Sequence, residues 1–154
     1  MYIYHHGLII REGTTGLKTE SIKELFTDAG WHNSSRPKWQ DEKFQIMFEN
    51  STWAFTVWNH EEMIGMVRVI SDKVMMATIM DLIVRSDYRN KGIGKKLIEL
   101  CLQKLPHGDW FANTFAKNFD FYRKCGFEVK DLSENGACVY HGFINARKQG
   151  NRLF

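Results

Sequence analysis

The chain has few cysteines, and their spacing argues against two kinds of site. Cys101, Cys125 and Cys138 cannot all pair with one another, and no two of them form a C-x-x-C arrangement. A disulfide framework and a structural zinc site are therefore not expected. His5 and His6 are adjacent, but no third ligand is apparent in the sequence, so we expect no metal.

The sequence also shows no long apolar run, no signal-peptide pattern in residues 1–6 and no strong charge of either sign. No apolar stretch approaches the roughly 20 residues of a membrane helix, and residues 1–6 have no basic start or apolar core. The net charge of +3 is too small to indicate nucleic-acid binding. These absences predict a cytoplasmic protein without membrane or nucleic-acid partners. With 154 residues and no repeat or linker, residues 1–154 are expected to form one domain.

The most informative feature that is present is a basic, glycine-containing loop between an apolar strand and an amphipathic helix, within residues 81–100. Backbone N–H groups at a helix start lack intrahelical acceptors, and the helix dipole adds partial positive charge there. Gly92 and Gly94 leave these amides open to an anion. Full positive charges surround the two glycines: Arg89, Lys91, Lys95 and Lys96. The pattern predicts a site for a phosphate-bearing ligand.

The spacing of the glycines distinguishes between three known kinds of phosphate-binding loop. A P-loop would need a glycine at Arg89 and a hydroxyl at Lys96, and a dinucleotide fingerprint would need a glycine at Leu97. The pattern R/Q-x-x-G-x-G/A is instead satisfied in full by residues 89–94. That hexamer, after a strand and before a helix, resembles the coenzyme A loop of the GCN5-related N-acetyltransferases (GNAT). The alternative is a plain basic surface turn that caps a helix.

A second motif lies at the family's usual distance from the first. Residues 119–128 resemble the family's Phe-Tyr-x-Lys-x-Gly-Phe helix end. Gly126 predicts the end of this helix, and Phe127 the start of the next strand. Taken alone, Tyr122 would be interpreted as a buried structural tyrosine. Two motifs in the right order favour a functional interpretation.

The resemblance implies the GNAT fold, a mixed α/β fold with a mostly antiparallel sheet of about seven strands and about four helices. Residue patterns predict strands at 2–11, 53–58, 63–70, 75–84, 110–113, 127–129 and 139–144. They predict helices at 19–29, 37–48, 93–105 and 119–125. Such sheets bind ligands where neighbouring strands part, and the glycine loop lies at such a strand end.

The resemblance also implies the residues that bind the coenzyme. The pantetheine arm would pair with the backbone of three residues: Leu82, Ile83 and Val84. The pyrophosphate would bind to the loop made of Arg89, Asn90, Lys91, Gly92, Ile93, Gly94 and Lys95. Many relatives contact the arm through an asparagine where this chain has Ala116, and Asn118 could replace it one turn further on.

Two residues are predicted to take part in catalysis. Tyr122 matches the family residue that gives a proton to the sulfur of coenzyme A. A phenol with an ordinary pKa near ~10 is protonated at neutral pH and can donate. Asp81 lies near the place where the family often has a carboxylate that acts as a base through water. A structural role for Asp81 is the equal alternative.

The predicted activity is transfer of an acetyl group from acetyl-CoA to a primary amine of a small molecule or peptide. The amine would attack the thioester directly in a ternary complex. The alternative is a regulatory module that binds acyl-CoA without turnover. The oligomeric state stays open; paired monomers are common in the family, so the resemblance allows a homodimer. The acceptor stays open among arylalkylamines, polyamines, aminoglycosides, amino acids and protein N-termini.

Overall fold

The computed structural model describes residues 2–31, 37–130 and 138. In this part of the chain, one sheet of six strands has its strands in sequence order. The strands are β1 Tyr2–His5, β2 Leu8–Glu12, β3 Trp53–Asn59, β4 Glu62–Ser71, β5 Met76–Val84 and β6 Asp109–Ala112. All neighbours are antiparallel except β5 and β6, which are parallel. The expected mixed and mostly antiparallel sheet is confirmed.

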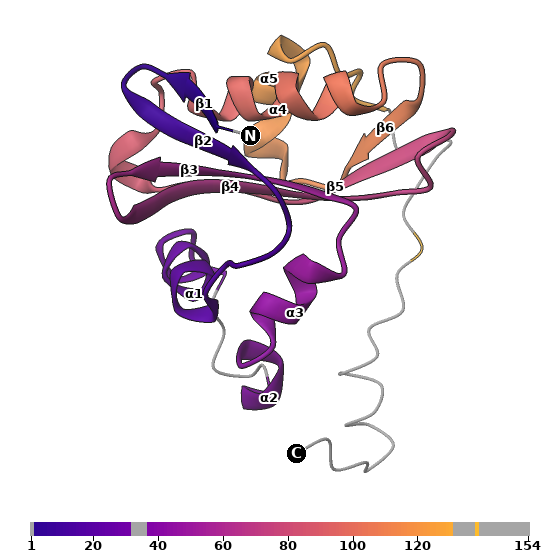
Figure 1. Ribbon diagram of the computed structural model, residues 1–154. Coiled ribbons are helices and arrows are strands. Elements are labelled where there is room, and N and C mark those ends of the chain that lie inside the picture. Colours follow the sequence, from indigo (N-terminus) through magenta and orange to yellow (C-terminus); the bar gives the residue numbers. More distant parts are fainter. Residues whose placement is uncertain (1, 32–36, 131–137, 139–154) are drawn as a thin grey trace.

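Helices cover both faces of this sheet (Figure 1). They are α1 Thr19–Asp28, α2 Lys38–Asp41, α3 Phe44–Glu49, α4 Ile93–Lys104 and α5 Phe119–Lys124, with 3-10 turns η1 Ser86–Tyr88 and η2 Ala116–Asn118. α4 and α5 lie on one face, whereas α1, α2 and α3 lie on the other. None of the helices in the described ranges is long and apolar enough to cross a membrane.

Each face of the sheet packs on its own apolar cluster. Leu97 and Cys101 of α4 are fully buried against strand residues such as Val67. On the opposite face, Ile22 of α1 and Phe48 of α3 are fully buried in a second cluster. Burial of these side chains, at about 25 cal/mol per Å² of apolar surface, ties both helix layers to the sheet. Packing on both faces therefore fixes the position of the sheet relative to α4 and the glycine loop.

Two element boundaries differ from the sequence-based prediction at the N-terminal end. Residues 2–11 form two strands instead of one, because His6 and Gly7 take positive φ values of 47° and 78° and turn the chain into a hairpin. The single helix expected over residues 37–48 is divided into α2 and α3. Lys43 lies between them with φ −109° and ψ 16°, outside the helical region.

The strand expected at residues 127–129 is also wrong, since residues 127–130 form no regular element. Phe127 instead completes the C-terminal cap of α5. Its N–H donates to the carbonyl of Tyr122 at 3.0 Å, and the N–H of Gly126 donates to the carbonyl of Arg123 at 3.0 Å. Gly126 has φ 93°, as this cap requires. The strand expected at 139–144 lies outside the described residues.

Candidate active site

A cleft opens where β5 and β6 stop pairing. The parallel ladder runs from Met76 opposite Asp109 to Ile79 opposite Ala112 and ends there. Beyond it, no described strand pairs with residues 80–84 on the β6 side of β5. A cavity of about 800 Å³ lies here, lined by this part of β5, the glycine loop and the segment from β6 to α5. The backbone edge of residues 82–84 is thus not covered by a described strand, although the carbonyl of Val84 accepts from Nε of Arg89.

The glycine loop presents backbone amides to the same cleft. Asn90 and Gly92 have positive φ values of 60° and 80°, and α4 begins at Ile93 without a side-chain cap. Lys96 makes the first backbone bond of the helix, to the carbonyl of Gly92 at 3.0 Å. Within the described residues, the N–H groups of Ile93, Gly94 and Lys95 have no acceptor. Such a helix start is suited to an anion.

The two glycines of the loop have different reasons to be glycine. A Cβ on Gly92 would meet nothing within 4 Å, so this position requires glycine for its positive φ. A Cβ on Gly94 would lie 3.2 Å from the ring of Phe121 and 3.9 Å from Val84. Gly94 therefore allows α5 to pack closely on α4. The sequence indicated an opening for phosphate at this position but gave no signal for the contact with Phe121.

The side chain of Arg89 is held within the protein. Its Nε donates to the carbonyl of Val84 at 2.9 Å, and its Nη2 lies 3.5 Å from the carboxylate of Asp28 at the end of α1. Asp28 also accepts from the N–H and the hydroxyl of Ser86, at 2.9 and 2.8 Å. The carboxylate of Asp28 thus binds both Ser86 and Arg89, which lie at the two ends of the turn that leads into the glycine loop. Residues 28 and 86 are far apart in sequence, and no local pattern indicates this link.

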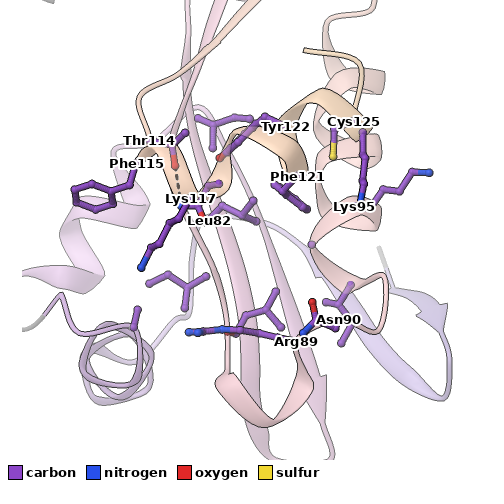
Figure 2. Close-up of a pocket in the computed structure, with 18 of the residues that line it drawn as sticks. Leu82, Arg89, Asn90, Lys95, Thr114, Phe115, Lys117, Phe121, Tyr122 and Cys125 are labelled. Atoms are coloured by element: carbon purple, nitrogen blue, oxygen red, sulfur yellow. Dashed lines mark hydrogen bonds between the residues drawn. The ribbon is translucent and has the colours of Figure 1, made fainter. Parts of the chain in front are cut away.

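Tyr122 lies in the cleft on the side opposite Arg89 and Asn90 (Figure 2). Its side chain is 8% exposed, and its ring packs edge-on against Phe121 and Phe127, with centroids 5.1 and 5.4 Å away. Burial raises the pKa of the Tyr122 phenol to about 12, and nearby thiols add to this shift. Within the described residues the hydroxyl has no hydrogen-bond partner. It is a protonated donor that faces a cavity.

Parted strands, free helix amides and a protonated tyrosine thus share one cleft. Over residues 19–127 the sequence matches the model of the acetyltransferase (GNAT) family. This chain belongs to the GNAT family. The fold and the family expected from the two sequence motifs are therefore confirmed.

Relatives of the GNAT chain include two plant proteins of greater length. It is 38% identical to an Arabidopsis thaliana protein named a chloroplastic GCN5-related N-acetyltransferase, over 52% of this chain and 32% of that protein. It is 41% identical to a Glycine max protein named a histone acetyltransferase, over 52% of this chain and 36% of that protein. The chain thus spans about a third of the length of these curated relatives.

Two solved structures show the same fold at low identity. A GNAT-family acetyltransferase from Streptococcus pneumoniae superposes with a TM-score of 0.71 at 24% identity, over 86% of this chain and 96% of that one. An acetyltransferase structure from Deinococcus radiodurans superposes with a TM-score of 0.73 at 19% identity, over 94% and 96%.

The cleft brings together ten of the eleven coenzyme-binding residues predicted for this GNAT chain. The exception is Lys91, whose Nζ turns back to the carbonyl of Asp87 at 3.2 Å. Asn118 lines the cleft, and its amide donates to the hydroxyl of Thr114 at 2.9 Å. Ala116 is not among the lining residues. An asparagine therefore lines the cleft from the position two residues beyond Ala116 in η2.

Asp81 does not line the cleft. Its carboxylate accepts from Nε of Arg68 at 2.7 Å, and both side chains are largely buried, at 15% and 11% exposure. Of the two interpretations that the sequence leaves open for Asp81, this ion pair favours the structural one.

The charge of the GNAT cleft is positive. Its described lining contains Arg89, Lys95, Lys117 and Lys124 but no aspartate or glutamate. Over the residues that the structure describes, no group of three or more histidine, cysteine or acidic side chains is close enough to hold a metal ion. The lining and the free amides fit a ligand that carries several phosphates.

Proposed function

We propose that this chain is an acetyl-CoA dependent N-acetyltransferase that acts on a primary amine of a small molecule or peptide. The observation that carries the proposal is the position of Tyr122, whose protonated hydroxyl faces the same cleft as the free amides of α4. Phosphate binding alone would not need a proton donor there. Acetyl transfer does, because the departing thiolate takes up a proton.

The described residues fit the coenzyme in three places. The open backbone edge of Leu82, Ile83 and Val84 would hold the pantetheine arm by strand-like hydrogen bonds. The amides of residues 89–95 would hold the pyrophosphate, with Lys95 as a full charge in the same lining. Asn118 would contact the arm from the opposite wall. Acetyl-CoA supplies the acetyl group as an activated thioester.

The role of Tyr122 in this proposal is to hold a proton at its phenol oxygen. Because the pKa is raised to about 12, the phenol stays protonated at neutral pH. Rings of Phe121 and Phe127 keep it in one orientation. Direct attack in a ternary complex requires that amine and coenzyme be bound together, so this cleft must admit the amine beside Tyr122.

The acceptor is proposed only by its chemical class, a primary amine. One plant relative is named a histone acetyltransferase, and a structural neighbour from Arabidopsis thaliana is a glucosamine-6-phosphate N-acetyltransferase with a TM-score of 0.64 at 20% identity. These names cover a protein amine and a sugar amine. A primary amine in its neutral form is the chemistry that they share.

A cytoplasmic location and a homodimer remain predictions of the sequence. One plant relative is named chloroplastic, which concerns that longer protein. Light scattering on the purified chain would measure its mass in solution.

The deciding experiment replaces Tyr122 by phenylalanine. We expect kcat, followed by release of the coenzyme A thiol with a panel of amines, to fall about 100-fold, as for loss of a general acid. The dissociation constant for coenzyme A should stay within about twofold, since the ring packing is kept. Tyr4→Phe is the matched control, because Tyr4 is exposed on β1.

Other results would contradict the proposal. Equal losses of kcat and coenzyme A affinity in Tyr122→Phe would contradict the role of Tyr122 as a general acid. Wild-type protein that binds acetyl-CoA but releases no thiol with any amine would point to the regulatory module.

A further inference from the structure

Strand β5 contains one extra residue at the place where it leaves β6. Arg68 of β4 stands opposite Asp81, but the next residue, Val69, stands opposite Ile79. Met80 is therefore the additional residue of a β-bulge. The parallel ladder between β5 and β6 ends at Ile79, on the last residue before this bulge. The bulge and the opening of the cleft coincide.

The bulge reverses the faces of β5. Ala77 and Ile79 belong to the cluster under α4, as alternate residues of one strand should. Without an interruption Ile83 would face the same way, but it is buried in the cluster under α1 and α3. Leu82 packs instead toward the α4 cluster. A one-residue shift exchanges the two faces of a strand, and that shift occurs at Met80.

Asp81 is the first residue after this reversal, and its side chain is bound on the face of α1 and α3. It accepts from Nε of Arg68 at 2.7 Å, and Nη1 of Arg68 lies 3.4 Å from the hydroxyl of Ser51. In a β5 strand without the bulge, Asp81 would share the face of Ala77 and Ile79. Its carboxylate would then enter an apolar cluster without Arg68, and burial of an unpaired charge is strongly unfavourable.

We propose that Asp81 is a positioning residue whose ion pair with Arg68 holds the β5 bulge and thereby presents residues 82–84 to the coenzyme. This inference rests on the proposed function, because it names what sets the coenzyme edge. The pair lies next to the bulge on both strands, so a slip of register by one residue would separate its partners. Asp81 acts through the strand and does not touch the reacting atoms.

The experiment compares Asp81→Asn, the milder Arg68→Lys, and the exchanged pair Arg68→Asp with Asp81→Arg. Glu42→Gln is the matched control, since it breaks the exposed Lys38–Glu42 pair at 4.0 Å. Three quantities are measured: the dissociation constant for coenzyme A, the pH profile of kcat/KM, and the hydrogen-exchange rates of the amides of residues 80–84.

We expect Asp81→Asn to weaken coenzyme A binding about tenfold, as if about one molecule in ten kept the bulge. Exchange of the amides of residues 80–84 should accelerate, and the shape of the pH profile should stay that of the wild type. Arg68→Lys should show the same changes to a smaller extent. The exchanged pair should recover most of the lost affinity, and Glu42→Gln should change none of the three.

A base role for Asp81 gives the opposite pattern and would overturn the inference. Asp81→Asn would then bind coenzyme A within about twofold of the wild type and lose one limb of the pH profile. If Asp81→Asn or the exchanged pair does not fold, Arg68→Lys decides by the same measurements. If the wild type binds no coenzyme A, the proposed function fails, and the amide exchange rates alone decide whether the ion pair holds the bulge.

Discussion

Replacement of Gly94 by alanine tests the close packing of α5 on the glycine loop. The family pattern accepts alanine at this position, so the motif alone predicts no effect. In this chain the new Cβ would lie 3.2 Å from two atoms of the Phe121 ring, and the ring must move by a few tenths of an ångström. Phe121 packs edge-on against Tyr122, so a displaced ring also moves the proposed acid.

The magnitude follows from two opposing effects. Alanine stabilises a helix by at most about 1 kcal/mol relative to glycine, and less near the first turn of α4. An additional methyl group in a packed site costs about 1–3 kcal/mol. We therefore expect the free energy of unfolding to fall by about 0–3 kcal/mol, while kcat falls about tenfold through misplacement of Tyr122. Urea unfolding and steady-state kinetics measure the two quantities.

Two further variants distinguish the effect of the contact with Phe121 from the effect of backbone strain. Addition of Phe121→Leu to Gly94→Ala should relieve the contact and restore part of the stability. In Gly92→Ala the new Cβ has open space, but φ is 80°. The free energy of unfolding should therefore fall by about 1–2 kcal/mol, and addition of Phe121→Leu should not restore it. The reasoning would be refuted if Gly94→Ala raised the free energy of unfolding and left kcat unchanged.

Two more predictions concern pH and the link to α1. The folded-state pKa of Tyr122 is raised to about 12 from an unfolded value near ~10, so its stabilisation is complete below the unfolded value and is lost as pH rises through the folded one. Urea unfolding between those pH values should show a decline that Tyr122→Phe lacks, and identical declines would contradict this origin. Asp28→Ala releases Ser86 and Arg89, so we expect about tenfold weaker coenzyme A binding in calorimetry and about 1–3 kcal/mol less stability. Asp28→Asn keeps one acceptor and should lose less, and unchanged affinity in both variants would rule out this link as a support of the loop.

The geometry of the glycine loop could be predicted because it depends on local interactions. A positive φ at Gly92, uncapped amides at the start of α4 and the apolar face of that helix depend on residues within a few positions of one another. The cap at Gly126 is local in the same sense. The order of strands around β5 also follows from alternation and from the helix between β5 and β6.

The contacts that support the site could not be predicted, because they join distant residues. Asp28 binds Ser86 across 58 positions of sequence, and Phe121 packs against a glycine of another helix. Each partner alone looks like an ordinary surface or core residue. The strand expected after Gly126 failed for a related reason, since Phe127 packs on the ring of Tyr122.

Asp81 shows most clearly where a periodic pattern fails. Alternation counted from Ala77 and Ile79 places Asp81 on the α4 face of β5, away from Arg68. One additional residue at Met80 transfers Asp81 to the opposite face and to Arg68. Nothing in the sequence distinguishes an uninterrupted strand of nine residues from one with a bulge. The same aspartate therefore fits a base in the sequence and an ion pair in the folded protein.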